Sequence, residues 1–288
     1  MPVVVTGATG PFGRHVVEHL LASGTPAADV VAAGRRVERL ADLAERGVRT
    51  AAIDYADVAG MTAAFAGADT LVLVSGSEVG RRVEQHGDAI DAAVAAGVRR
   101  VVYTSASHAD TSALVLAPEH KATEELIRAS GLAFTILRNN WYTENYAATL
   151  EQARATGEVV SSTGAGRVAS APRADYAEAA AVVARTPGHD GVAYELGGDE
   201  PWDHAELAAT IGDVIGAPVV YREVTPEEHL AALLAAGLDE GTAGFVVALD
   251  GNIRDGLLAG GSHDLSTLLG RPTTPLADAL RTLAGDAA

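Results

Sequence analysis

The sequence predicts an α/β fold, with a doubly wound parallel sheet and a smaller C-terminal α/β lobe. Short strands alternate with helices through the first half of the chain, the strands are apolar throughout, and this rhythm ends near residue 140. Uninterrupted apolar strands are typical of parallel sheets with helices on both faces, because neither face meets water. Strands that alternate with helices favour right-handed βαβ units.

The first half justifies this prediction element by element. The opening strand, 3–6, is a β-branched run, and a glycine-rich turn separates it from a helix over 14–22. Further strands are expected at 30–33, 50–53, 70–74, 101–104 and 134–137. Helices are expected between them at 37–46, around 61–65, and at 81–96 and 119–130. Each pair of strands therefore has a helix-length connection, as a parallel sheet requires.

After residue 140 the pattern becomes irregular. Helices are expected at 142–155, 174–185, 204–215, 227–236 and 275–284, with strands at 159–162 and 192–196. The strand at 192–196 could rejoin the main sheet. We expect a domain over residues 1–143 and a second lobe over 144–288 that leans on the carboxyl edge of the sheet and shapes the substrate site.

Composition excludes several classes of function. The net charge is −17 over 288 residues, which argues against a nucleic-acid partner or binding to an anionic membrane. The absence of cysteine excludes disulfides and thiolate ligands and suits a reducing compartment, so we expect a cytoplasmic protein. The chain enters an apolar strand by residue 3 without a charged leader, and no run of about 20 apolar residues predicts a membrane span.

The strongest motif is a glycine-rich loop between the first strand and the first helix. Its spacing is G-x-x-G-x-x-G, which is typical of the dinucleotide-binding turn of a Rossmann domain. The first glycine permits a tight turn, the second admits the pyrophosphate, and the third lets the helix pack closely. The predicted contacts are Gly7, Ala8, Thr9, Gly10, Pro11, Phe12 and Gly13.

The end of the second strand indicates which dinucleotide is bound. NAD sites place an acid there, whereas this chain has Gly34, Arg35 and Arg36 roughly 20 residues beyond the loop. A guanidinium binds a 2′-phosphate that an acid would repel, so we predict NADPH over NADH, with Arg35 on the phosphate. The alternative is that both arginines are merely solvated.

Two further strand ends complete the predicted cofactor site. Asp54 and Tyr55 end the third strand, where the adenine edge commonly lies. Ser75, Gly76 and Ser77 follow the fourth strand, next to the topological switch point, and are expected under the ribose and nicotinamide.

Several catalytic motifs are absent. Typical short-chain dehydrogenases use Tyr-x-x-x-Lys, in which the lysine lowers the tyrosine pKa for proton transfer. The one lysine is Lys121, and Ala117 stands four residues before it, so the pair cannot be present. No G-x-S-x-G elbow exists. His15 to His19 matches H-x-x-E-H, but no motif nominates a third ligand, so no metal is expected.

From residue 75 onward the chain resembles a known family, the NmrA-like atypical short-chain dehydrogenases, and within it the bacterial NADPH:quinone oxidoreductases. The segments that carry the resemblance span nearly the whole chain: 75–80, 103–105, 108–112, 119–120, 137–142, 144–146, 173–176 and 269–274. The resemblance implies NADPH binding by the N-terminal domain and flavin-free hydride transfer to a small quinone-like acceptor.

The resemblance also implies site residues. Residues 139–144 line the nicotinamide and substrate cleft in this family. The expected cofactor contacts are thereby extended by Thr104, Ser105, Arg138, Asn139, Asn140, Trp141, Tyr142 and Arg173. Asn140 stands where close relatives often have glycine, which could narrow the pocket. Some relatives carry a lysine where His120 aligns.

The candidate catalytic donors are Tyr142, His120 and Asn139, because a quinone needs positioned hydrogen-bond donors rather than a strong acid. Each has an alternative: Tyr142 as a core tyrosine, His120 as a surface or cap histidine, and Asn139 as a brace of the lobe. Arg138 has the same alternative: it could orient the carboxamide or the phosphates, or simply brace the lobe. Arg173 and Asp175 are expected to form a structural ion pair.

Rival functions share the same cofactor residues. They are a redox sensor that binds NADP without turnover, and a reductase of a dye or a biosynthetic carbonyl. The sequence does not fix the oligomeric state, for which a homodimer is one expectation.

Overall fold

The computed structural model describes residues 1–260 and 262–285. A seven-stranded sheet in the order β3-β2-β1-β4-β5-β6-β9 forms its centre, and every neighbouring pair is parallel. The strands are β1 (Val3–Val5), β2 (Val30–Gly34), β3 (Arg49–Ala52), β4 (Thr70–Leu73), β5 (Arg100–Ala106), β6 (Ala133–Asn139) and β9 (Val192–Leu196). The doubly wound parallel sheet is therefore confirmed, and β1 to β6 lie within two residues of their predicted bounds.

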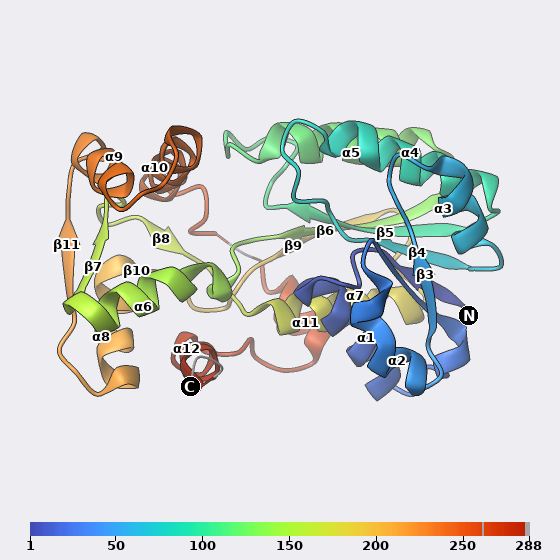
Figure 1. The fold of residues 1–288 in the computed structure, drawn as a ribbon, viewed down its shortest axis with the longest axis horizontal. Helices are drawn as coiled ribbons and strands as arrows, with labels where there is room; N and C mark the ends of the chain where they lie inside the picture. The colour runs from blue at the N-terminus through green and yellow to red at the C-terminus, as the bar shows by residue number, and fades with distance from the viewer. Residues whose placement is uncertain (261, 286–288) are drawn as a thin grey trace.

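Helices cover both faces of the sheet (Figure 1). One face carries α3 (Val58–Phe65), α4 (Arg82–Ala95) and α5 (Ala117–Ala129), and the other carries α1 (Pro11–Ala22), α2 (Ala41–Glu45), α7 (Arg173–Arg185) and α11 (Asp264–Leu269). The apolar run of β1 serves both layers, because Val3 and Val5 pack into one core cluster and Val4 into the other. Short 3₁₀ turns, η1 (Ala27–Asp29) and η2 (Val37–Leu40), flank β2, so the helix expected at 37–46 is split between η2 and α2.

A smaller lobe lies beyond the carboxyl end of β6 (Figure 1). Its helices are η3 (Thr143–Tyr146), α6 (Ala147–Thr156), α8 (His204–Ile215), α9 (Pro226–Ala235), α10 (Glu240–Arg254) and α12 (Leu276–Gly285). Two small sheets, β7 (Glu158–Ser161) with β11 (Val220–Glu223) and β8 (Arg167–Val168) with β10 (Trp202–Asp203), complete it. A third apolar cluster around Trp202, Leu207 and Ile211 forms its core.

The second half of the chain does not stay within this lobe. Helix α7 packs against α1, α11 packs against α7, and β9 pairs with β6 at the edge of the main sheet. Residues on either side of 143 thus contribute to one core, in which Val16 and Leu20 of α1 meet Tyr176 and Ala180 of α7. Among the described residues, no helix has both the length and the apolar character that a bilayer span needs.

Candidate active site

The glycine loop forms the floor of a cleft at the carboxyl edge of the sheet. Gly7 adopts a φ of +63°, which glycine tolerates without strain. A Cβ on Gly13 would lie 2.5 Å from the carbonyl oxygen of Gly7, so only glycine permits this approach of α1 to the loop. Helix α1 begins after Gly10 without a side-chain cap. Its first-turn N–H groups, together with the helix dipole, therefore favour a bound anion.

This cofactor cleft has a volume of about 400 Å³. It runs from the glycine loop, past the ends of β2 and β3, to the loop after β4. Most of the predicted contacts line it: Gly7, Thr9, Gly10, Pro11, Phe12, Gly13, Arg35, Tyr55, Ser75, Gly76 and Ser77. Gly34, Arg36, Arg39, Ile53 and Val74 complete the wall.

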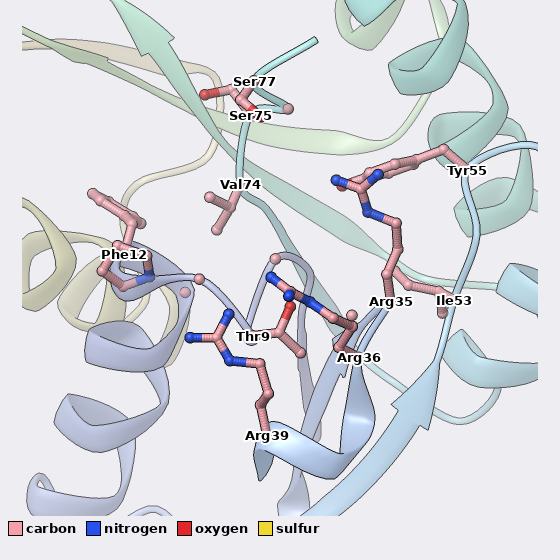
Figure 2. A pocket seen from close by; sticks show the side chains of 16 residues that line it. Thr9, Phe12, Arg35, Arg36, Arg39, Ile53, Tyr55, Val74, Ser75 and Ser77 are labelled. Carbon is pink, nitrogen blue, oxygen red and sulfur yellow. The ribbon is translucent and has the colours of Figure 1, made fainter.

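Three arginine side chains, those of Arg35, Arg36 and Arg39, line the cleft near the end of β2. Figure 2 shows Arg36 and Arg39 pointing toward the glycine loop near Thr9, whereas Arg35 extends toward Tyr55. The Arg35 side chain is 68% exposed and forms an ion pair of 3.0 Å with Glu78, on the loop after β4. This cationic end stands out in a chain of net charge −17 and suits a phosphate group.

A second pocket, of about 300 Å³, continues from the same Ser75–Ser77 segment. We call it the acceptor pocket. Its polar side is formed by side chains that include Ser105, His120, Asn139 and Tyr142, and its apolar side by Leu114, Leu116, Trp141, Phe245 and Leu258. The two pockets share Ser75, Gly76 and Ser77 as lining residues, so they adjoin at the loop after β4.

Tyr142 presents a hydroxyl group whose proton is unused. Nδ2 of Asn139 donates to the Tyr142 hydroxyl oxygen at 3.0 Å, which leaves the tyrosine proton free for another acceptor. Burial raises the Tyr142 pKa to about 12, so the hydroxyl stays protonated at neutral pH. The Arg173 guanidinium lies 5.2 Å from the ring centroid, in a cation–π contact. Oδ1 of Asn139 is buried and has no partner among the described residues.

His120 is a buried residue of α5 rather than a surface or cap histidine. It is 5% exposed, so the surface interpretation is wrong. Its Nδ1 lies 2.8 Å from the hydroxyl oxygen of Tyr103. Burial, reinforced by the positive charge of Arg82, lowers the His120 pKa to about 3. The imidazole is therefore neutral at physiological pH.

Arg138 lies apart from both pockets. Its guanidinium is held by Glu124 at 2.7 Å, Glu195 at 2.9 Å and Asp110 at 2.9 Å. This geometry supports the bracing role that was the alternative for Arg138. Thr104 also lines neither pocket. Its hydroxyl accepts a hydrogen bond of 2.8 Å from the backbone N–H of Ser75. Ala8 lines an adjoining hollow, and Asp54 accepts a bond from Ala56.

The expected ion pair between Arg173 and Asp175 is not formed. Asp175 binds Arg271 at 2.9 Å, because the C-terminal segment after α11 folds back over α7. Asn140, which could narrow the pocket, lines it together with Leu258. Its Nδ2 donates to the carbonyl oxygens of Leu258 at 3.2 Å and Gly260 at 2.9 Å.

Several lining residues were not predicted. In the cofactor cleft these are Arg39, Ile53 and Val74, and in the acceptor pocket Arg82, Ala106, Leu114, Leu116, Asn145, Phe245 and Leu258. Arg39 lies in η2 and follows Arg36 by one 3₁₀ turn, so a third arginine close to the end of the second strand was a signal available in the sequence. The apolar residues carry no such signal. Within residues 1–260 and 262–285, no cluster of three or more His, Asp or Glu side chains has a geometry suited to a metal ion.

Comparisons with known proteins agree with this geometry. A profile of NAD(P)H-binding proteins matches residues 7–187. Quinone oxidoreductase 2 of Escherichia coli (strain K12) is 43% identical over 278 residues, which cover 96% of this chain and 97% of that protein.

Solved structures give the same picture. The E. coli NADPH-dependent quinone oxidoreductase in complex with NADPH has a TM-score of 0.93 at 42% identity, covering 99% of this chain and 100% of that one. The triphenylmethane reductase of Citrobacter sp. in complex with NADP(H) has a TM-score of 0.91 at 34% identity, covering 98% and 100%.

Proposed function

Because this chain belongs to the NAD(P)H-binding, NmrA-like family, we propose that it is an NADPH-dependent, flavin-free quinone oxidoreductase. One observation carries this proposal. A cationic, glycine-floored cleft adjoins a second pocket with an apolar wall, and this pocket is lined by uncharged hydrogen-bond donors as well as by Arg82 and Arg173. A dinucleotide fits the cofactor cleft, and a planar, uncharged acceptor with carbonyl oxygens fits the acceptor pocket.

The residues present fit the cofactor. The close approach at Gly13 leaves room for the pyrophosphate against the backbone, and the cluster of Arg35, Arg36 and Arg39 suits the 2′-phosphate. The unpaired Oδ1 of Asn139 is an acceptor suited to an amide N–H such as that of the nicotinamide. NADPH, when bound, supplies the hydride.

The chain's own residues then act on the acceptor. Hydride addition to a quinone leaves negative charge on a ring oxygen, and one proton from solvent completes the hydroquinone. Tyr142 and His120 are the donors that we place on the acceptor oxygens while that charge develops. Asn139 orients the Tyr142 hydroxyl, and Leu116, Trp141 and Phe245 provide apolar surface that orders the ring.

We further propose that the protein works in the cytoplasm without a nucleic-acid partner, which its strongly acidic charge supports. In this proposal residues 1–143 bind the cofactor and the lobe beyond residue 144 selects the acceptor. A homodimer is the proposed assembly, to be tested by sedimentation.

The test is to mix the purified protein with NADPH or NADH and a panel of benzoquinones, naphthoquinones and triphenylmethane dyes. We expect the reduced-nicotinamide absorbance to fall with quinones and NADPH. If NADPH binds but is not oxidised with any acceptor, the proposed enzymatic function is overturned and the redox-sensor alternative is favoured. Consumption with dyes alone would assign a different acceptor.

Arg35→Asp tests the cofactor assignment directly. We expect the Kd for NADPH to rise roughly 10- to 100-fold, since a charge-assisted bond to phosphate is replaced by repulsion, while the Kd for NADH changes little. Arg49→Asp, an exposed change at the start of β3, is the matched control. If Arg35→Asp raised the Kd for both nucleotides equally, Arg35 would not be the residue that binds the 2′-phosphate.

A further inference from the structure

We propose that Tyr103 is a positioning residue that fixes the tautomer of His120, so that His120 offers a neutral N–H to the acceptor. This inference rests on the proposed function of the acceptor pocket. Tyr103 lies on β5, is fully buried, and is absent from the walls of both pockets. Any effect it has on the acceptor therefore passes through His120.

The direction of the hydrogen bond follows from counting protons. By distance and angle the Tyr103 hydroxyl makes one hydrogen bond among the described residues, to Nδ1 of His120 at 2.8 Å. The Thr123 hydroxyl is its second polar neighbour, and the Thr123 proton is already donated to the Glu119 carbonyl. Burial raises the Tyr103 pKa well above its ordinary value, so the hydroxyl keeps its proton. A buried O–H group that lacks an acceptor is costly, so the hydroxyl donates to Nδ1. Nδ1 is then an acceptor, and the ring proton resides on Nε2.

The neighbouring histidine leaves this assignment undisturbed. Nε2 of His86 accepts from the backbone N–H of Gly76 at 3.0 Å, so the His86 proton is on Nδ1, 3.0 Å from the Thr123 hydroxyl. Thr123 in turn donates to the Glu119 carbonyl at 2.9 Å. The Thr123 hydroxyl thus accepts from His86 and donates to Glu119, and neither of these bonds involves Tyr103.

The charges around His120 favour the neutral ring. From α4 it faces Arg82 and the neutral His86, and on its own helix Glu119 and Glu124 lie nearby. Glu119 is neutralised by Arg82 at 2.6 Å, and Glu124 by Arg138 at 2.7 Å. From across the pocket, Arg173 adds a further positive charge. None of these groups leaves an unpaired carboxylate beside the ring that would stabilise an imidazolium.

The consequence is a donor aimed at the pocket. Nδ1 is taken by Tyr103, the ring lines the acceptor pocket, and Nε2 has no protein partner among the described residues. A neutral imidazole N–H stabilises a developing oxyanion without itself becoming an acid that must be recharged. Without the Tyr103 hydroxyl, the proton is free to move to Nδ1, which turns a lone pair toward the acceptor instead.

The test is Tyr103→Phe, which keeps the buried ring and its edge contact with His86. Long-range ¹H–¹⁵N spectra of the NADPH-free protein should show His120 protonated at Nε2 in the wild type and a mixture of tautomers in the variant. We expect kcat with quinones to fall roughly two- to tenfold, the factor equivalent to one hydrogen bond, with the Kd for NADPH unchanged.

A matched control exists in the chain. Tyr194 on β9 holds His189 Nδ1 at 2.8 Å, with the same atoms and distance but outside both pockets. Tyr194→Phe should leave kcat unchanged. In a His120→Ala background, Tyr103→Phe should cause no further loss of kcat, because its effect acts through the imidazole.

Three results would overturn the inference: His120 protonated at Nδ1 or charged in the wild type, an unchanged kcat in Tyr103→Phe, or additive losses in the double variant. The proposed function fails separately, when the wild type does not oxidise NADPH with any quinone. The NMR measurement needs no activity, so it decides the tautomer in either case.

Discussion

Residues of one type take different roles in this chain. Arg35 is exposed and paired with a single carboxylate, Arg173 lies over the Tyr142 ring, and Arg138 is buried among three carboxylates. The sequence could place Arg35, because the glycine motif fixes where the second strand ends. It could not place Arg138, because Glu124 and Glu195 are brought to it by α5 and β9 only in the folded chain.

Arg138 gives a prediction at this scale. Replacing it with alanine leaves Glu124 buried without its cation, so we expect a loss of about 3–5 kcal/mol in the free energy of unfolding, measured with urea. Arg128→Ala, which removes a more exposed partner of Glu124 at 3.9 Å, should cost less than about 1 kcal/mol. Unchanged stability with weakened NADPH binding would instead place Arg138 in the cofactor site.

At the scale of elements, strong periodic patterns were predicted well and weak ones were missed. The buried strands and α1, α4, α5 and α7 lie close to their predicted bounds, because apolar spacing and glycine-rich ends mark them. Helix α10 was missed. Gly241, Gly244 and Gly251 lower its helix propensity, and it is stabilised instead by an Asp239 cap and by packing of Leu249 and Ile253.

Helix α4 clamps the loop that joins the two pockets. Nε2 of His86 accepts from the Gly76 N–H at 3.0 Å, and Nε of Arg82 donates to the Gly76 carbonyl at 2.9 Å. Both bonds to this one residue come from the first turns of α4, where Arg82 and His86 are buried. The position of Ser75–Ser77, which lines both pockets, therefore depends on the protonation state of His86.

This clamp predicts a pH dependence. Burial lowers the His86 pKa from 6.5 to about 3. Between these pH values His86 is protonated in the unfolded chain and neutral in the native state. Stability is fully present above about pH 6.5 and declines as the pH falls toward 3. We expect Tm, measured by calorimetry, to decrease from pH 7 to pH 5.

His86→Gln is the informative variant, because an amide oxygen can still accept from Gly76 but does not titrate. Its Tm should depend less steeply on pH than that of the wild type. A Tm that rises on acidification, or equal slopes for the two proteins, would contradict the role given to His86.

At the scale of the whole molecule, the site combines residues that local sequence patterns mark with residues that only tertiary packing brings together. The cofactor half could be predicted because its glycines, Arg35 and Ser75–Ser77 follow successive strand ends. The acceptor half could be predicted in part: beside 139–142, the predicted residues that line it are Ser75, Gly76, Ser77, Ser105, His120 and Arg173. Its other wall comes from Leu114, Phe245 and Leu258, which meet through the packing of the second lobe and belong to no local pattern.

Asn140 connects these two walls. Its amide holds the backbone of Leu258 and Gly260, so it sets how closely that segment approaches Trp141 across the pocket. We expect Asn140→Ala to raise kcat/KM for naphthoquinone relative to benzoquinone by roughly threefold, since losing both hydrogen bonds, each of about 1 kcal/mol, loosens the wall. The Kd for NADPH should not change.

Asn252→Ala serves as the comparison, because it removes a different bond across the lobe boundary, from the Val115 N–H at 3.0 Å. An equal shift in both variants would mean general loosening of the lobe. An unchanged ratio in Asn140→Ala would show that the wall is held by other contacts, such as the bond from Ala169 N–H to the Leu258 carbonyl.

The pairing of Arg35 with Glu78 has a consequence for how the nucleotide comes and goes. With Arg35 on the 2′-phosphate, as we propose, the phosphate competes with a resident carboxylate, and loading becomes an exchange of anions on one guanidinium. In this proposal NADH leaves the Glu78 counterion in place. We expect the same carboxylate to speed departure of the spent nucleotide.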